Sequence, residues 1–129
     1  MGQQQLLLIV LGVIIVGIAV VVGINVFTAS STNANRDAVV SDLTTLASMA
    51  QQYYRKPTAM AGGGQSFTNW AIPPQLLSTA NGTYSAPTVG ANSIKLVGIG
   101  NEIGDDGTNK VKVEMTVVPD KIDTTNVVN

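Results

Sequence analysis

The chain has 129 residues, enough for one small domain and one long additional element. Its 7 basic and 8 acidic residues give a net charge of −1, so no basic surplus indicates direct binding of nucleic acid. Because Cys and His are both absent, disulfides, thiolate and imidazole metal sites, and Ser-His or Cys-His nucleophile pairs are excluded. We therefore expect a structural protein rather than an enzyme, with no catalytic residue, no metal and no cofactor.

The N-terminal region carries no charge. No charged side chain precedes Arg36, and the run Leu6–Ile24 contains only Leu, Ile, Val, Ala and Gly. A helix of this length, rising about 1.5 Å per residue, would span about 28 Å, close to the ~30 Å hydrocarbon core of a bilayer. We expect this segment to enter a membrane or to be buried among other apolar helices.

Three interpretations of residues 1–27 compete. A cleaved signal peptide would have a basic start and a shorter apolar core, whereas neutral Gln3–Gln5 precede a long one. A plain membrane anchor would usually have Lys or Arg on its cytoplasmic flank, and none occurs before Arg36. The third interpretation is a helix that first resides in the membrane and later packs against copies of itself, and the continuation of the pattern favours it.

After a polar patch, apolar residues recur in steps of four, three, four and three. They are Val39, Leu43, Leu46, Ala50 and Tyr53. This spacing is typical of a helix with one buried face, and Pro57 ends it because the residue before a proline disfavours helical geometry. The pattern predicts one helix over residues 2–55, apolar all round in its first half and amphipathic in its second, where it would cover a domain of its own chain.

Strand and turn signals follow Pro57. Gly62–Gly64 indicates a flexible turn or linker, a loop is anchored by Phe67, Trp70 and Ile72, and one helical turn is expected within 73–79. Strands are expected at 83–86, 93–101 and 110–118, with an edge strand at 124–128 and a hairpin turn at 104–107. The expected fold is α+β: a long N-terminal helix packed on a small antiparallel sheet of three to four strands. Its parts are the apolar helix 1–29, the amphipathic half 30–56, and the loop and sheet domain 57–129.

Two motifs in the second half could carry chemistry. Asn101, Asp105, Asp106 and Asn109 place several oxygens near one turn, as a hard cation requires, but the spacing is not that of an EF-hand, so a solvated hairpin turn is favoured. The triplet 81–83 matches the glycosylation sequon, which makes Asn81 a possible modification site.

Three glycines interrupt the apolar helix, at Gly12, Gly17 and Gly23. Each costs about 1 kcal/mol relative to Ala in a helix interior. Either glycine is simply common in membrane helices, or these positions allow neighbouring helices to approach closely, with a stretch of loosened helix over 17–23.

The neutral start Met1–Gln5, followed directly by Leu6–Val10 and then by a long amphipathic helix and a hairpin sheet, resembles the type IV pilin superfamily, in particular its major filament subunits. The resemblance implies that Met1 is the processed, N-methylated terminus; alternatively Gly2 closes a short leader and Gln3 is the first residue. It also places Gln5 where the family usually has a glutamate, so a hydrogen bond would replace the salt bridge to a neighbour's terminal amine. The chain departs from the family further in lacking a proline within the helix and a C-terminal cysteine pair.

The resemblance implies a homo-oligomer, a helical filament of identical subunits, for attachment, motility or DNA uptake. Its partners would be a prepilin peptidase and a membrane assembly platform. The precursor would sit in the cytoplasmic (inner) membrane, and the filament would be extracellular on the cell surface. Two alternatives stay open: a type II secretion pseudopilin or minor pilin, and a monomeric membrane-anchored β-domain that binds a partner. The expected assembly contacts are Gln5, Leu6, Leu7, Leu8, Ile9, Val10, Gly12, Val16, Gly17, Val20 and Gly23.

Overall fold

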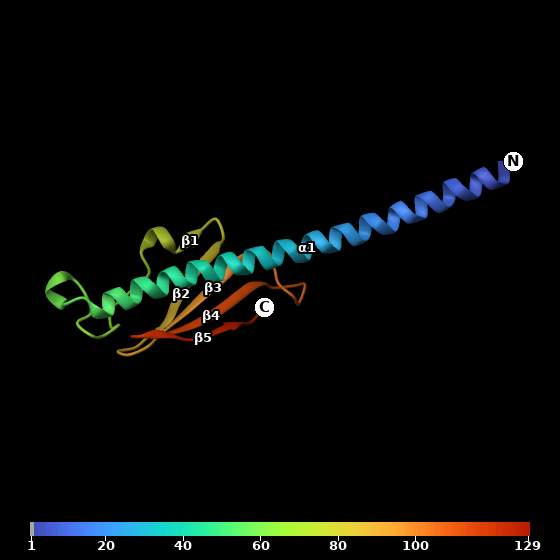
Figure 1. Ribbon diagram of the computed structural model, residues 1–129. Helices are drawn as coiled ribbons and strands as arrows, with labels where there is room; N and C mark the ends of the chain where they lie inside the picture. The colour runs from blue at the N-terminus through green and yellow to red at the C-terminus, as the bar shows by residue number, and fades with distance from the viewer. Residues whose placement is uncertain (1) are drawn as a thin grey trace. The chain divides into compact units, whose positions relative to one another are not determined.

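The computed structural model describes residues 2–129, which form one long helix, two short 3-10 helices and one antiparallel sheet (Figure 1). The helices are α1 (Gly2–Arg55), η1 (Thr58–Met60) and η2 (Pro74–Leu76). The strands are β1 (Ser78–Thr79), β2 (Gly82–Val89), β3 (Ile94–Ile103), β4 (Lys110–Val118) and β5 (Lys121–Val127). The α+β class and the helix over residues 2–55 are confirmed. Met1, with its expected processing and methylation, lies outside the described residues.

The chain divides into two compact units, with the boundary after Ser31. The first unit consists of α1 residues up to Ser31. Its helix is unbroken through Gly17 and Gly23, so the loosened stretch considered there is not present. The second unit, Thr32–Asn129, contains the rest of α1, both 3-10 helices and the whole sheet. It is therefore the unit that holds a tertiary fold.

The sheet has five strands in the order β1-β2-β3-β4-β5, each antiparallel to the next. The expectation of three to four strands is wrong by this count. The strand that the sequence analysis missed is β1, whose two residues pair with Thr83 and Gly82 and are too few to show any alternation. The hairpin turn between β3 and β4 is confirmed, and β4 has the bounds expected from its alternating pattern.

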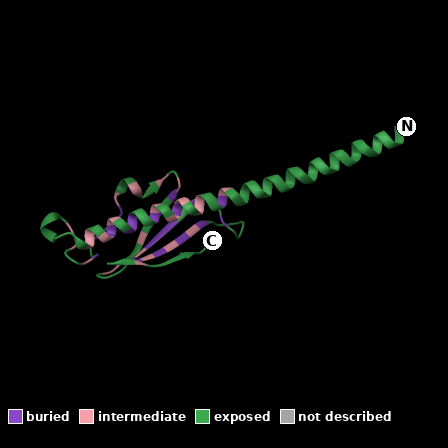
Figure 2. Ribbon diagram, in the orientation of Figure 1, coloured by how far each residue is buried: buried purple, intermediate pink, exposed green. Residues whose placement is uncertain are grey.

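One face of the sheet packs against α1 within the second unit (Figure 2). The alternation in β4 places Val111, Val113, Met115 and Val117 in the core. Of the expected stripe, Val39, Leu43, Leu46 and Ala50 are at most 2% exposed, whereas Tyr53 is half-buried. Ala47, beside the stripe, is also fully buried. This repeat of four and three residues therefore identifies the face of α1 that covers the sheet.

The helix lies close to β3 because glycine is found at the contact. A Cβ atom built on Gly98 would lie 2.7 Å from Cγ1 of Val39, closer than real Cβ atoms approach, and 3.0 Å from Cε1 of Tyr84, which is a tight contact. Tyr84 is itself buried in the core. The missing side chain thus sets how closely α1 and the sheet can pack.

The glycine run after the helix is a cap rather than a flexible linker. The amide of Gly63 donates to the carbonyl of Tyr53 at 2.8 Å, and the amide of Gly64 donates to that of Lys56 at 2.9 Å. A Cβ on Gly63 would lie 1.8 Å from the carbonyl oxygen of Ser66, so the chain can fold back here only without a side chain. These bonds go to the carbonyls of Tyr53, in the last turn of α1, and of Lys56, directly after it, so the glycine run closes the end of the helix.

We expect Leu43→Ala to destabilise the second unit by about 2–5 kcal/mol, because Leu43 is 0% exposed and its truncation leaves a cavity between helix and sheet. Thermal unfolding of a fragment beginning at Ser30 measures this. The matched control is Ser48→Ala on the exposed face of the same helix, which should change stability by less than about 0.5 kcal/mol. Equal melting temperatures for the two variants would show that the wrong face of α1 has been assigned to the core.

Candidate functional site

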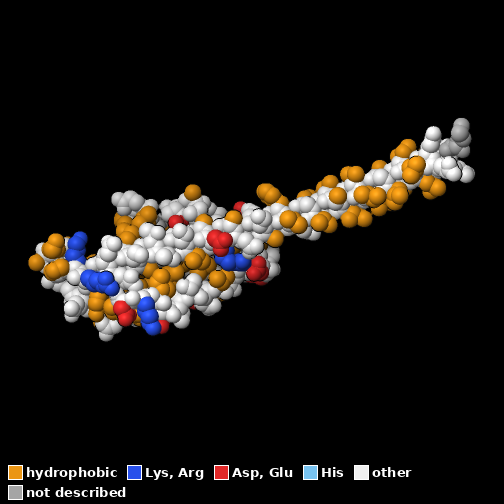
Figure 3. Space-filling model, in the orientation of Figure 1, with side chains coloured by type: hydrophobic (Ala, Val, Ile, Leu, Met, Phe, Trp, Pro, Cys, Tyr) orange, Lys and Arg blue, Asp and Glu red, His pale blue; other side chains and the backbone are white. Residues whose placement is uncertain are grey.

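The apolar side chains of the first unit are uncovered. Every Leu, Ile, Val and Phe from Leu6 to Phe27 is between 53% and 75% exposed. Figure 3 shows hydrophobic side chains along the visible face of this helical segment. The segment has a mean hydropathy of 3.3 over its most apolar 18-residue window, none of it buried, and by length and composition it is able to cross a membrane. We call the side chains of residues 6–27, which are apolar except for Asn25, the apolar helix surface.

The expected assembly residues all lie in this helix or at its start. The side chains of Gln5, Leu6–Val10, Val16 and Val20 are exposed. Successive residues of an α-helix are about 100° apart, so a consecutive run such as Leu6–Val10 surrounds the axis. The apolar helix surface is therefore a cylinder rather than a stripe, and only an environment on all sides can bury it.

Open space surrounds the three helical glycines. A Cβ added at Gly12, Gly17 or Gly23 would meet no heavy atom within 4 Å. Nothing in the described chain therefore requires glycine at these positions, in contrast to Gly98. A neighbouring helix would be able to approach the backbone closely there, as small residues allow in apolar media.

The free energy at stake in this surface is large. Full burial of one Leu, Ile or Val side chain contributes about 1.5–3 kcal/mol. Summed over the side chains of residues 6–27, the gain from leaving water is on the order of tens of kcal/mol. That exceeds the ~5–15 kcal/mol of a typical folded domain, so the isolated chain in water is not a stable end state for this segment.

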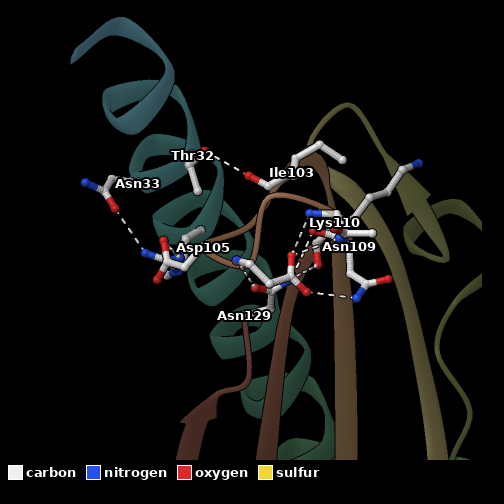
Figure 4. Close-up of polar contacts among 10 residues, drawn as sticks. Thr32, Asn33, Ile103, Asp105, Asn109, Lys110 and Asn129 are labelled. Atoms are coloured by element: carbon white, nitrogen blue, oxygen red, sulfur yellow. Dashed lines mark hydrogen bonds and ion pairs between the residues drawn. The ribbon is translucent and has the colours of Figure 1, made fainter. Parts of the chain in front are cut away.

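The second unit begins with polar side chains that bind the helix to the C-terminal end of β3 (Figure 4) and to the turn between β1 and β2. The hydroxyl of Thr32 donates to the carbonyl of Ile103 at 2.9 Å. The side-chain amide of Asn35 donates to the carbonyl of Asn81 at 2.9 Å, and its oxygen accepts from the backbone amide of Asn101 at 3.1 Å. These contacts were not predicted, because the residues read only as a polar patch.

The first acidic residue of the β3–β4 loop is bound to the helix. Asp105 Oδ1 lies 3.1 Å from Nη2 of Arg36, whose Nη1 donates to Asn33 at 3.0 Å. The side chain of Arg36 is 15% exposed, whereas that of Asp105 is 79% exposed. The Asp105 side of the ion pair is therefore largely solvated, and the carboxylate is directed toward the guanidinium of Arg36.

The second acidic residue is satisfied within its own loop. Asp106 accepts from the backbone amides of Thr108 and Asn109, both at 2.9 Å, and from the Asn109 side chain at 2.8 Å. These bonds, led by that from Thr108, lower the pKa of Asp106 to about 2. The side chain of Asn129 closes the loop by donating to the carbonyls of Asn109 and Lys110. The two carboxylates considered as cation ligands, Asp105 and Asp106, thus have partners within the chain. Residues 2–129 contain no group of three acidic, Cys or His side chains placed to hold a metal.

A carboxylate in the middle of the helix makes a third polar contact. Asp42 Oδ2 accepts from Thr79 Oγ1 and from Asn81 Nδ2, each at 3.1 Å, and from the hydroxyl of Tyr84. Burial raises the pKa of Asp42. The hydrogen bonds from Tyr84, Asn81 and Thr79 together lower it by more, so the pKa lies below the usual value of 3.8. Burial and the bond to Asp42 raise the pKa of Tyr84 to about 12.

This cluster bears on the possible modification site. The Asn81 nitrogen that glycosylation would use is engaged with Asp42, and Asn81 is only partly exposed. The only signal in the sequence for such a cluster is a lone acidic residue, Asp42, directly before the buried Leu43. Its partners lie 37 to 42 residues further along the chain, where spacing gives no information.

No protein-family model matches the chain, and neither does any curated protein or any solved structure. The similarity to pilins therefore rests on the N-terminal residues and on the packing of an N-terminal helix against an antiparallel sheet.

We expect Asp42→Asn to destabilise the second unit by about 1–2 kcal/mol near pH 7, because an ionised acceptor of three hydrogen bonds is lost from a partly solvated site. Since folding lowers the pKa of Asp42 below 3.8, its contribution is present above that pH and is lost as the pH falls through the folded value. The difference between variant and parent should therefore be smaller in acid, below pH 3.8, than at pH 7. Chemical denaturation at both pH values measures it.

The control for this experiment is Asp37→Asn, which removes an exposed carboxylate from the same helix. It should change stability little at either pH. A destabilisation by Asp42→Asn that is the same in acid and at neutral pH would contradict the charged role given to Asp42.

Proposed function

We propose that this chain is the structural subunit of a type IV pilus-like extracellular filament, polymerising through the apolar helix surface. One observation carries the proposal: residues 6–27 expose apolar side chains on every side of a helix, while the second unit completes a hydrophobic core from its own residues. Residues 6–27 are thus not needed to fold the domain. Its burial is available to drive association with copies of itself, in which each helix is covered by its neighbours.

The charge pattern supports a membrane stage followed by an assembled stage. From Gly2 to Asn35 no side chain is charged, so the helix can lie in a bilayer and leave it without carrying an ion across an apolar phase. Register between helices would then come from packing at the glycines and from hydrogen bonds of the Gln5 amide. A prepilin peptidase and a membrane assembly platform would be the partners, and the filament would serve attachment, motility or DNA uptake.

A membrane-anchored monomer is the second candidate, favoured by the length and hydropathy of the same segment. A bilayer would cover the apolar helix surface on all sides, just as a bundle of neighbouring helices would. A secretion pseudopilin or minor pilin would differ from the proposed subunit in abundance and filament length rather than in its buried surface. Polymerisation is therefore the property that separates the filament subunit from the anchored monomer.

We expect Val16→Asp to abolish filament formation. A carboxylate at a membrane helix centre costs about 2.5–3.5 kcal/mol, and every subunit of the filament would carry one. The measurement is the yield of filaments sheared from cells that express the chain with an assembly system. The control is Thr88→Asp, which puts the same charge on an exposed position of β2 and should leave the yield unchanged. A normal yield from Val16→Asp would refute burial of the apolar helix surface.

We also expect a fragment beginning at Ser30 to be soluble, monomeric and cooperatively folded, because the core and the polar contacts of the second unit lie within Thr32–Asn129. The full chain, extracted from membranes, should instead form long ordered fibres or require detergent. Size-exclusion chromatography of the fragment and electron microscopy of the full chain test the pair. A soluble fragment together with a full chain that never polymerises in cells would favour the anchored monomer.

A further inference from the structure

One polar side chain interrupts the apolar helix surface. Asn25 is the only polar residue among residues 6–27, and it is exposed. Within residues 2–129 its side-chain amide forms no hydrogen bond, whereas the hydroxyl of Thr28, three residues further on, donates to the carbonyl of Ile24 at 3.0 Å. An amide is costly to remove from water unless its donors and its acceptor find partners. Burial of the apolar helix surface therefore requires a hydrogen-bonding group beside Asn25.

A second amide lies at the other end of the same surface. Gln5 is exposed, directly precedes Leu6 and is 20 residues before Asn25. At about 1.5 Å per residue the two positions are about 30 Å apart along the axis, close to the ~30 Å hydrocarbon core of a bilayer. In a membrane each amide would lie near one boundary, within reach of water. In a bundle of helices that excludes water, both amides need partners from protein.

The two amides lie on opposite sides of the helix. At about 100° per residue, Asn25 is rotated by about 200° from Gln5, whereas Gln3 and Gln4 lie within about 60° of the side of Asn25. Two parallel helices that are related by a shift along their axes touch through opposite sides, because the side that one turns toward its neighbour is the side that the neighbour turns away. Of the three glutamines, Gln5 is therefore the one placed to meet Asn25 of a shifted copy.

We propose that Gln5 of one copy forms hydrogen bonds with Asn25 of a second copy that is displaced by about 30 Å along the helix axis. The inference rests on the proposed filament and names a contact that sets its register. Each amide has an NH2 donor and a carbonyl acceptor, so the two side chains are able to form two N–H···O bonds with each other. Because the contact uses two different positions, it repeats along a row of subunits instead of closing a pair.

Pairs of like amides would not produce growth along an axis. Pairing of Asn25 with Asn25, or of Gln5 with Gln5, requires parallel helices at the same level, and copies at one level close into a pair or a ring. The mixed pair displaces each copy relative to the one before it. A single polar pair in an apolar helix interface fixes the register at some cost in stability, as a buried Asn does in coiled coils.

A double-mutant cycle tests the contact in filaments of the full chain. Gln5→Leu and Asn25→Leu each leave the partner amide buried without a hydrogen bond, whereas the double variant removes both groups. We expect each single variant to release subunits at a lower guanidinium chloride concentration than the parent does. The double variant should recover the parental midpoint or exceed it. Where a single variant forms no filaments, recovery in the double variant is measured as filament yield.

The matched control combines Gln4→Leu with Asn25→Leu. It removes a neighbouring amide from a different side of the helix, so it should not restore the stability lost through Asn25→Leu. Rescue by Gln4→Leu equal to that by Gln5→Leu would show that added apolar surface, and not removal of the partner amide, accounts for the recovery. That result would overturn the pairing.

Two further outcomes of the cycle would contradict the contact. One is a pair of single effects that simply add in the double variant, and the other is single variants as stable as the parent, as expected if water reaches both amides. Either result, obtained with a parent chain that forms filaments, leaves the proposed function standing. A parent chain that forms no filament contradicts the proposed function, and the contact that rests on it fails as well.

Electron cryomicroscopy of the parent filaments gives a second readout. We expect one class of neighbouring helices to be displaced by about 30 Å, with the amides of Gln5 and Asn25 within about 3 Å of each other. Filaments in which Asn25 faces water, or an amide other than that of Gln5, would overturn the contact.

Discussion

The exposure of residues 6–27 to water is unfavourable, and the location and assembly of this protein depend on how that exposure is removed. The segment exposes Leu, Ile, Val and Phe on every side of the helix, at 53% to 75% of their surface. No charged group lies within it or beside it before Arg36. Its removal from water is favourable on the order of tens of kcal/mol, more than a typical domain gains by folding. Whatever covers this helix therefore determines where the protein resides and in what form.

The second unit is independent of that requirement. Its core is filled by one face of the helix from Val39 onward, by the inward residues of the sheet, and by Phe67 from the connecting loop. Polar contacts from Thr32, Asn35 and Arg36 tie the beginning of this helical stretch to β3 and the β3–β4 loop. Because the domain has a core of its own, it can remain folded if residues 6–27 move from a bilayer into a bundle of copies. A core that included residues 6–27 would be disrupted by such a move.

Periodic features of this protein were predictable from the sequence, and contacts between distant residues were not. The repeat from Val39 to Tyr53 and the stop at Pro57 gave the helix, and the alternation in residues 110–118 gave β4 with its bounds. In contrast, β1 is too short to carry a pattern. Gly62–Gly64 was interpreted as a flexible turn or linker, because its hydrogen bonds to the carbonyls of Tyr53 and Lys56 leave no signal in the sequence. The cluster around Asp42 and the loop contacts of Asn129 join residues at least 19 positions apart. The candidate assembly residues could be placed on the apolar helix surface, but the contacts expected of them involve other copies of the chain and stay a prediction.

Electron cryomicroscopy of filaments sheared from cells that express the chain, with mass spectrometry of the same material, tests the central claim most directly. The account predicts a helical polymer of this subunit in which the segments 6–27 pack against one another in a core without water. A chain found only in the membrane fraction, with no filament that contains it, would contradict the account. So would a filament in which residues 6–27 lie on the outer surface.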